Sequence, residues 1–138
     1  MPEFTSQIAY YLERYKNGHW DDAFHSLLEM DHRALPELMM EFRRTDDIDL
    51  RIFLVNVIWE HRQQSCVEFL REALFDLESR VWREALNGLV TLASPAALEV
   101  LRAGRAREFP AQRKTDEFRQ WLEEAIEQTE DEIRRKGT

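Results

Sequence analysis

The stretch LRIFLVNVIW, from Leu50 to Trp59, decides the fold of this chain. On a helix, at about 100° per residue, its apolar side chains cover nearly the whole circumference. Only Arg51, Asn56 and the following Glu60 are left for water. A helix that is apolar on almost every side must be covered by several neighbours, so we expect it to be the centre of a helical stack.

The composition favours one all-α domain over residues 1–138. The chain is 43% hydrophobic and 33% charged, which is typical of a globular protein. It is long enough to bury a core without metal or disulfide support. With only four Gly and four Pro, it lacks the turn residues that a β-sandwich or barrel needs.

The same sequence predicts a cytoplasmic protein with no membrane segment. No apolar run approaches the roughly 18 residues of a membrane span, and no basic region followed by an apolar core opens the chain. The single cysteine, Cys66, excludes an internal disulfide framework and fits a reducing compartment.

Start and stop signals divide the chain into about eight helices. Gly18 ends the first helix, Pro36 suits the first turn of another, and Ser94 with Pro95 begins a third. Thr115 is the expected cap of the last helix. The predicted elements are a capping helix over 5–17, helix pairs at about 20–45, 47–76 and 79–104, a loop over 105–114, and a C-terminal helix over 115–136.

The helix pairs repeat with a period of about 31 residues. Leu50 and Leu54 fall on Val81 and Ala85 at that offset. An earlier copy fits at an offset of 30 to 32 residues. Such units cannot bury their apolar faces alone, so they stack and need a capping helix at each end.

The segment VWREALNGLVTLASPAALEVLRAGR resembles the typical unit of the HEAT-repeat family, specifically the short bacterial HEAT-like repeats. Its valine-led helix, short turn and P-x-A-L-x-x-L helix follow in the family's order. Asp49, Leu50 and Arg51 are similar to the family's aspartate, valine, arginine helix start. The resemblance covers roughly residues 20 to 104.

The repeats depart from the family pattern and are therefore degenerate. Trp82 stands in the arginine position, and Gln63 and Gln64 replace the usual Gly-Asp turn. The resemblance implies a HEAT-like helical-hairpin solenoid with three helix pairs and two capping helices. It says more about fold than about function, because this scaffold carries many unrelated roles.

One candidate metal site is a row on a single helix face. Asp22, His25 and Glu29 are spaced i, i+3, i+7, with His32 beyond, and such side chains can bind a divalent cation. The alternative is a solvated helix face with i, i+4 contacts. No second Glu-x-x-His or His-x-x-x-His completes a coordination shell, so we predict no metal site.

Neither Cys66 nor His61 is predicted to be catalytic. Cys66 is placed at a helix N-terminus, which lowers thiol pKa, but it corresponds to Ala97 beside the apolar face of the next repeat. His61 falls on the position of Leu92 and is expected to pack. The chain also lacks a Gly-rich phosphate loop and a G-x-S-x-G elbow. We predict no enzyme activity and no cofactor.

Carboxylates at the turns form the most informative candidate site. The repeat places the acids of two equivalent turns along one edge, and exposed acids of the second helices add to them. Ordinary N-cap and surface chemistry is the alternative for any single residue. The predicted partner-binding residues are Asp46, Asp47, Asp49, Trp59, Glu68, Glu72, Asp76 and Glu78.

Two further features limit that edge. At the third equivalent turn the sign changes, with Arg105 and Arg107. Trp59, with Ile52 and Val55, lies away from the main core face, where it either meets a neighbouring repeat or forms an exposed apolar patch for a partner.

The predicted function is a protein-binding module. The net charge of −8 repels phosphate and suits a protein with a basic surface. Size, acidity and predicted location favour a bacterial immunity or antitoxin-like protein that covers a basic toxin domain, for example a nuclease. We expect a monomer or a weak homodimer.

Two other classes stay open. One is a nucleic-acid-binding or repair protein of the HEAT-like glycosylase type, for which residues 99–115, with five basic and two acidic side chains, are the only basic segment. Retention on heparin would favour it. The other is an accessory scaffold of an enzyme complex, which would co-purify with a metabolic enzyme.

Overall fold

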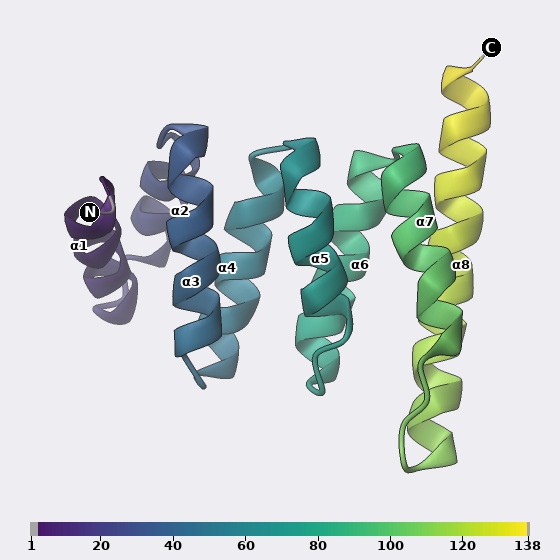
Figure 1. Ribbon diagram of the computed structural model, residues 1–138. Helices are drawn as coiled ribbons and strands as arrows, with labels where there is room; N and C mark the ends of the chain where they lie inside the picture. The colour runs from purple at the N-terminus through teal and green to yellow at the C-terminus, as the bar shows by residue number, and fades with distance from the viewer. Residues whose placement is uncertain (1–2, 138) are drawn as a thin grey trace. The chain divides into compact units, whose positions relative to one another are not determined.

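The structure is a computed structural model that describes residues 3–137, and over these residues it contains eight α-helices and no β-strand (Figure 1). The prediction of an all-α chain with about eight helices is confirmed. None of these helices is both long and apolar enough to cross a bilayer. The helices are α1 (Thr5–Lys16), α2 (Trp20–Leu28), α3 (Leu35–Arg44), α4 (Ile48–Glu60), α5 (Val67–Leu74), α6 (Ser79–Leu92), α7 (Pro95–Ala103) and α8 (Gln112–Lys136), with short 3-10 helices at His32–Ala34, Gln64–Cys66 and Gly104–Ala106.

The chain forms two compact units. The first extends to Gln63 and contains α1 to α4, and the second begins at Gln64 and contains α5 to α8. The boundary lies inside the predicted helix pair at 47–76. Each unit has its own set of packed helices.

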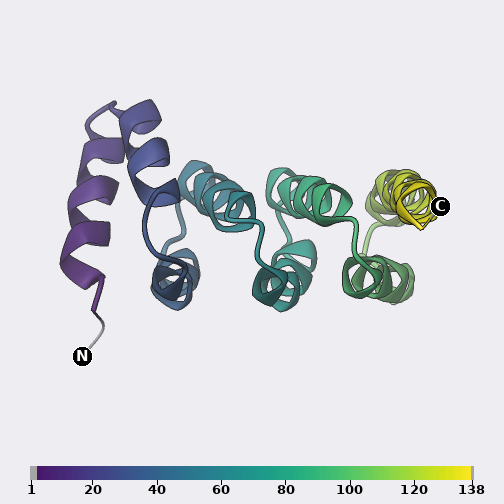
Figure 2. The same cartoon turned by 90° about the horizontal axis from the view of Figure 1, so that it is seen from above.

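In the first unit, α1 and α2 lie side by side as a helical hairpin (Figure 2). Helix α3 packs against α4, and α2 also contacts α4. Apolar residues at helical spacing meet between these helices, as the sequence pattern predicts. The buried side chains of the unit include Ile8, Leu12, Ala23, Leu27, Leu35, Leu38, Phe42, Leu54 and Ile58.

Helix α4 is buried on several sides, as its composition requires. The side chain of Asp47 accepts a hydrogen bond from the Leu50 N–H at 3.2 Å and so caps the helix. Leu54 and Val55, which point to different sides of the helix, are both fully buried. Ile52 and Phe53 are only half-buried, like Arg51, Asn56 and Glu60, so the covered part of the helix is narrower than the sequence predicts.

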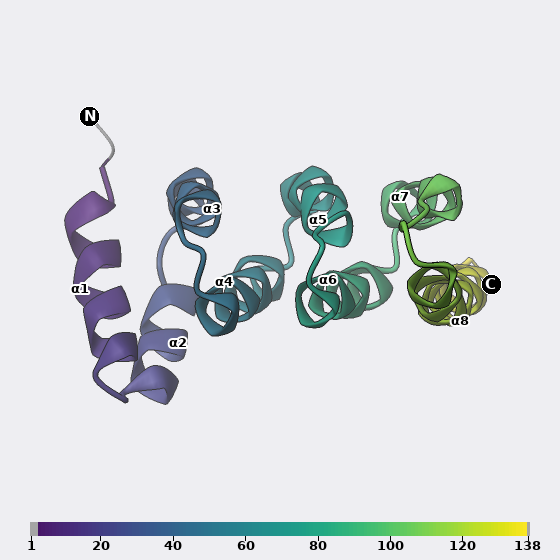
Figure 3. The same cartoon turned by 90° about the horizontal axis from the view of Figure 1, so that it is seen from below.

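In the second unit, α5 and α7 form one layer and α6 and α8 form the other (Figure 3). Helix α6 packs against α5, α7 and α8. Its Val81 and Leu89 are fully buried, as the repeat predicts from their α4 counterparts. Phe118, Leu122 and Ile126 of α8 complete the core.

Two arginines close equivalent turns in the two units. Arg51 of α4 donates to the main-chain carbonyls of Phe42 and Thr45, at 2.9 and 3.0 Å, at the end of α3. Arg107 donates to the carbonyls of Leu74 and Asp76, at 2.6 and 2.8 Å, at the end of α5. Each guanidinium group thus donates to carbonyls at or just beyond the C-terminal end of a helix, where it also interacts favourably with the helix dipole.

Arg107 thereby replaces a side chain that the second repeat lacks. At the repeat offset, Arg51 corresponds to Trp82, which cannot supply a guanidinium. Trp82 packs instead against the Phe118 ring, at a centroid distance of 5.0 Å. The Arg107 guanidinium lies 5.0 Å from the same ring and 4.1 Å from that of Phe109. A residue after α7 thus caps α5.

The last helix begins three residues earlier than predicted, at Gln112. Pro110 stays outside the helix, so the connecting loop is shorter than the expected 105–114, and Gly104–Ala106 forms a 3-10 turn. Thr115 is not the cap. Its hydroxyl accepts a hydrogen bond from the Phe109 N–H at 2.8 Å, which ties the loop to the helix it precedes.

Candidate functional site

The row on α2 lies on an exposed helix face with ion-pair contacts. The carboxylate of Asp22 pairs with the Arg14 guanidinium at 2.6 Å, and His25 lies 3.5 Å from Asp21, one turn away on the same helix. Across residues 3–137 no group of three or more His, Cys, Asp or Glu side chains is arranged to hold a metal ion. These side chains therefore form a solvated helix face, which was the alternative to a metal site.

His61 and Cys66 are both packing residues. Cys66 is fully buried. His61 is buried too, and its Nε2 lies 3.2 Å from the Leu27 carbonyl oxygen. Since a carbonyl only accepts, Nε2 carries the proton and donates. Burial lowers the pKa of His61, and the nearby His32 lowers it further, so the neutral ring is favoured.

The turn between α3 and α4 is acidic, and side-chain hydrogen bonds hold its main chain in place. The Asp47 N–H donates to the Thr45 hydroxyl at 3.1 Å, while the Asp47 carboxylate caps α4. Arg51 holds the Thr45 carbonyl from the other side. Asp46, Asp47 and Asp49 are all exposed. Three carboxylates therefore face solvent from a short segment with little freedom to move.

A groove of about 600 Å³ opens beside this acidic turn, within the first unit. Side chains from three helices line it. Its apolar part includes Tyr15 and Phe53, whose rings lie 4.4 Å apart between centroids, and Trp20, which is 61% exposed. We call it the Trp20 groove. Its lining residues are Tyr15, Lys16, Trp20, Asp47, Asp49, Ile52 and Phe53.

The Trp20 groove is negatively charged. Asp47 and Asp49 contribute two carboxylates and Lys16 one ammonium group. Burial raises the pKa of the Tyr15 phenol above its usual value, and the charges of Asp47 and Asp49 raise it further. The same two carboxylates that repel a phenolate would attract a cation that enters the groove.

The second unit has its own acidic turn, between α5 and α6. Asp76 and Glu78 are half-buried, and the Asp76 carboxylate accepts from the Glu78 N–H at 2.9 Å. Leu77, between them, is 84% exposed. A smaller hollow of about 270 Å³ lies at this turn, with Leu77 and Glu78 in its lining. That the carboxylates of both turns follow one edge stays a prediction.

The remaining predicted site residues have different surroundings. Glu68 and Glu72 are exposed on α5, and Glu68 pairs with Arg71 at 3.0 Å. Trp59 is only 7% exposed, and Arg62 lies over its ring. Trp59 therefore has the packing role that was the alternative and does not form an exposed apolar patch. Its neighbour Val55 is fully buried.

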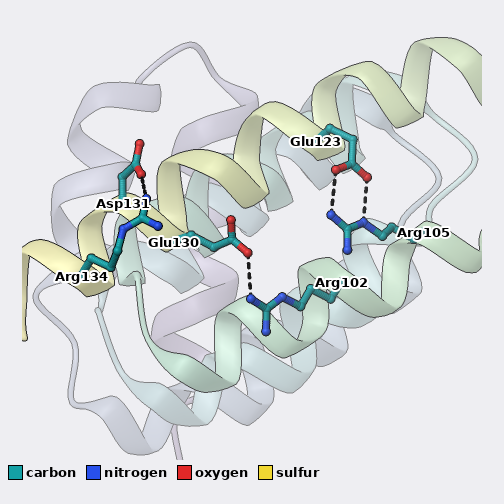
Figure 4. Close-up of polar contacts among 6 residues, drawn as sticks. All are labelled: Arg102, Arg105, Glu123, Glu130, Asp131 and Arg134. Atoms are coloured by element: carbon teal, nitrogen blue, oxygen red, sulfur yellow. Dashed lines mark hydrogen bonds and ion pairs between the residues drawn. The ribbon is translucent and has the colours of Figure 1, made fainter.

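Two arginines of the basic segment 99–115 pair with glutamates of α8. Figure 4 shows Arg102 paired with Glu130 at 2.7 Å and Arg105 paired through two nitrogens with Glu123 at 2.8 Å. Farther along α8, Arg134 pairs with Asp131 (Figure 4). Arg107 is buried. Arg102, Arg105 and Arg107 therefore all have partners within the second unit.

Sequence reasoning missed the aromatic half of the Trp20 groove. Trp20 precedes Ala23, Phe24 and Leu27 at helical spacing, so the pattern places it on the buried face. Its position at the first residue of α2 leaves it beyond the helices that would cover it. The only signal was the glycine turn just before it, because an aromatic residue at a helix end is poorly covered.

The fold and the repeat define a class of helical repeat protein, and sequence comparison identifies the family. Residues 35–116, more than half of the chain, match the family model of HEAT repeats. The chain belongs to the HEAT-repeat family, and the predicted HEAT-like helical solenoid class is confirmed. HEAT repeats form helical modules for protein interaction, and the family is generally non-enzymatic. Comparisons with curated proteins and with solved structures found no significant match.

Proposed function

We propose that this HEAT-repeat protein binds a protein with a basic surface and performs no chemistry itself. The observation that carries the proposal is the acidic turn between α3 and α4. Its carboxylates are exposed, and Asp47 and Arg51 hold its backbone. A preorganised acidic surface attracts a basic partner from a distance and loses little entropy on binding.

In its sharper form, the proposal is a bacterial immunity or antitoxin-like role. An acidic protein that covers the basic active surface of a toxin, such as a nuclease, would mimic the phosphates of the toxin's substrate. The net charge of −8 and the exposed acids of both units support this form. Charge complementarity of this kind gives fast association and selects the partner by its charge.

The test begins with capture of partners from the source cell by the tagged chain. We expect a basic protein whose expression alone arrests growth, and we expect co-expression of the chain to restore growth. A variant with Asp46→Lys and Glu72→Lys should restore growth less well. Recovery of a partner that is not toxic would contradict the immunity role, and recovery of an acidic partner would contradict the proposal as a whole.

Heparin chromatography separates this proposal from the nucleic-acid alternative. Because Arg102 and Arg105 are paired with glutamates and Arg107 is buried, we expect the chain to flow through at physiological salt. Retention on heparin would favour nucleic-acid binding instead. Co-purification with a metabolic enzyme would favour the accessory scaffold.

A further inference from the structure

We propose that the Trp20 groove is the pocket that receives an arginine side chain of the basic protein partner. The inference rests on the proposed function and specifies where and how that partner would be held. It joins two observations that do not depend on each other: a large aromatic side chain left at the surface, and carboxylates beside it. Either one alone has an ordinary explanation.

The exposed indole is the first step. Trp20 is 61% exposed although α2 has a packed face against both α1 and α4. Tyr15 from α1 and Phe53 from α4 lie in the same groove with their rings in tilted contact, so the groove has aromatic surfaces contributed by three helices. Aromatic faces of this kind attract cations, and tryptophan does so most strongly.

The carboxylates are the second step. Asp47 and Asp49 line the same groove as the three aromatic rings. Asp47 is held by its cap contact with Leu50, so its position does not need to be fixed on binding. The lining thus carries two carboxylates and one ammonium group, which favours a cationic ligand. A phosphate or a second acidic copy of the chain has the wrong sign.

An arginine fits these surroundings better than a lysine. Its guanidinium is planar, so it stacks on an indole or phenol ring while its edge donates hydrogen bonds to a carboxylate. It is also less strongly hydrated than an ammonium group and is easier to bring against an apolar wall. The structure itself uses this pairing, since the Arg51 guanidinium lies 3.9 Å from the Phe42 ring centroid.

The first experiment uses small peptides as probes. The ¹⁵N-labelled full chain is titrated with blocked Gly-Arg-Gly, Gly-Lys-Gly and Gly-Gln-Gly, and the four indole N–H signals and the backbone amides are followed by NMR. We expect a saturable shift at the Trp20 indole and at the Asp47 and Asp49 amides. Binding of the arginine peptide should be about threefold or more tighter than that of the lysine peptide.

Matched variants place the effect in the groove. Trp20→Ala and Asp49→Asn should each weaken the arginine peptide about fivefold or more, while Tyr10→Ala should leave its affinity unchanged and Asp46→Asn should weaken it clearly less. Tyr10 is an exposed aromatic residue of the same unit, and Asp46 belongs to the same acidic turn, but neither lines the groove. Circular dichroism checks that each variant is folded.

Several outcomes would overturn the inference. Equal binding of the lysine peptide would remove the preference for arginine, and shifts centred on another indole would remove the groove. If Asp46→Asn weakened the peptide as much as Asp49→Asn, binding would depend on the negative charge of the whole turn and not on the groove. Shifts at Trp20 that follow protein concentration without peptide would mean that a second copy occupies the groove.

The inference and the proposed function fail in different ways. If Trp20→Ala and Asp49→Asn bind the captured basic partner as tightly as the unmodified chain, the groove is not the arginine site, and the proposal of a basic partner is unaffected. If the arginine peptide binds as expected but no basic protein is captured, the proposed function is wrong while the groove holds arginine.

Discussion

Arg107 shows how a single side chain can restore a contact that a degenerate repeat has lost. Burial lowers the pKa of its guanidinium, and the attraction of Asp76 opposes that shift. Arginine still remains charged at neutral pH. The charge is placed at the C-terminal end of α5, where the helix dipole favours a cation.

We therefore expect Arg107→Ala to destabilise the protein by roughly 2–4 kcal/mol, because two carbonyls lose their donor and the rings of Phe75, Phe109 and Phe118 lose their contact. Urea denaturation measures the loss. The stability of Arg107→Lys should lie between those of the unmodified chain and Arg107→Ala, because one ammonium group cannot replace the two donor edges of the guanidinium. The control is Arg105→Ala, which removes an exposed ion pair and should change little. Equal effects at the two positions would contradict the capping role.

His61 should make the protein less stable as the pH falls. Its pKa in the folded protein lies below the unfolded value of about 6.5, so the unfolded chain binds more protons below that pH. Protonation would also place a proton on Nδ1, which is buried without a hydrogen-bond partner. The stability that the neutral ring provides is complete above pH 6.5 and decreases as the pH falls toward the folded pKa.

Thermal unfolding of His61→Gln between pH 7.5 and 5 tests this expectation. The glutamine amide can still donate toward the Leu27 carbonyl but does not titrate, so the curve should be flatter than that of the unmodified chain. His19→Gln, at an exposed imidazole, is the matched control. A slope that is unchanged in His61→Gln would show that other groups cause the acid sensitivity.

At the scale of elements, α4 connects stability with the proposed site. Its core-facing residues hold the first unit together, while its first turn carries the acids that line the Trp20 groove. Asp47 belongs to both, since it caps the helix and faces the groove. The two roles can be separated because asparagine caps a helix as well as aspartate does.

Accordingly, Asp47→Ala should cost about 1 kcal/mol of stability, whereas Asp47→Asn should cost little. Both substitutions remove the charge from the groove, so both should weaken an arginine ligand. Chemical denaturation and the peptide titration together distinguish the cap from the charge. If Asp47→Asn were as destabilising as Asp47→Ala, the carboxylate charge rather than the hydrogen bond would stabilise the helix.

The buried positions of α4 should tolerate few substitutions. Leu54 is fully buried, so Leu54→Ala is expected to cost roughly 2–5 kcal/mol, and Leu54→Asp should unfold the protein. Met40→Asp, at an exposed apolar residue, is the control that introduces the same charge. A folded Leu54→Asp variant of full thermal stability would show that α4 is not essential to the packing of the first unit.

At the scale of the whole molecule, the acidic charge should act on the rate of association. The double variant Asp46→Lys, Glu72→Lys should bind a basic partner about tenfold more slowly at low ionic strength, and the difference should shrink as salt is added. Stopped-flow mixing measures the rate. Glu124→Lys, Glu127→Lys on α8 makes the same change in net charge at two other exposed acids and should slow association less. Equal rates for the two pairs would mean that only net charge matters.

What could be predicted from sequence is what depends on neighbours along the chain. Periodicity of about 3.6 residues and the 31-residue repeat indicate about eight helices and the burial of most apolar residues between Leu50 and Trp59. Residue type and repeat position also assign His61 and Cys66 to the core. These predictions succeed because a helix and its buried face are encoded within one or two turns of sequence.

The tertiary structure alone decides which charges and aromatic rings reach the surface. From the sequence, Arg107 is expected to be an exposed charge, but it is buried against α5, about 30 residues away in the chain. Trp20 reads as a core residue, yet it is exposed beside two carboxylates of another helix. Long side chains find partners across the packed helices, and their partners depend on packing geometry that local periodicity does not encode.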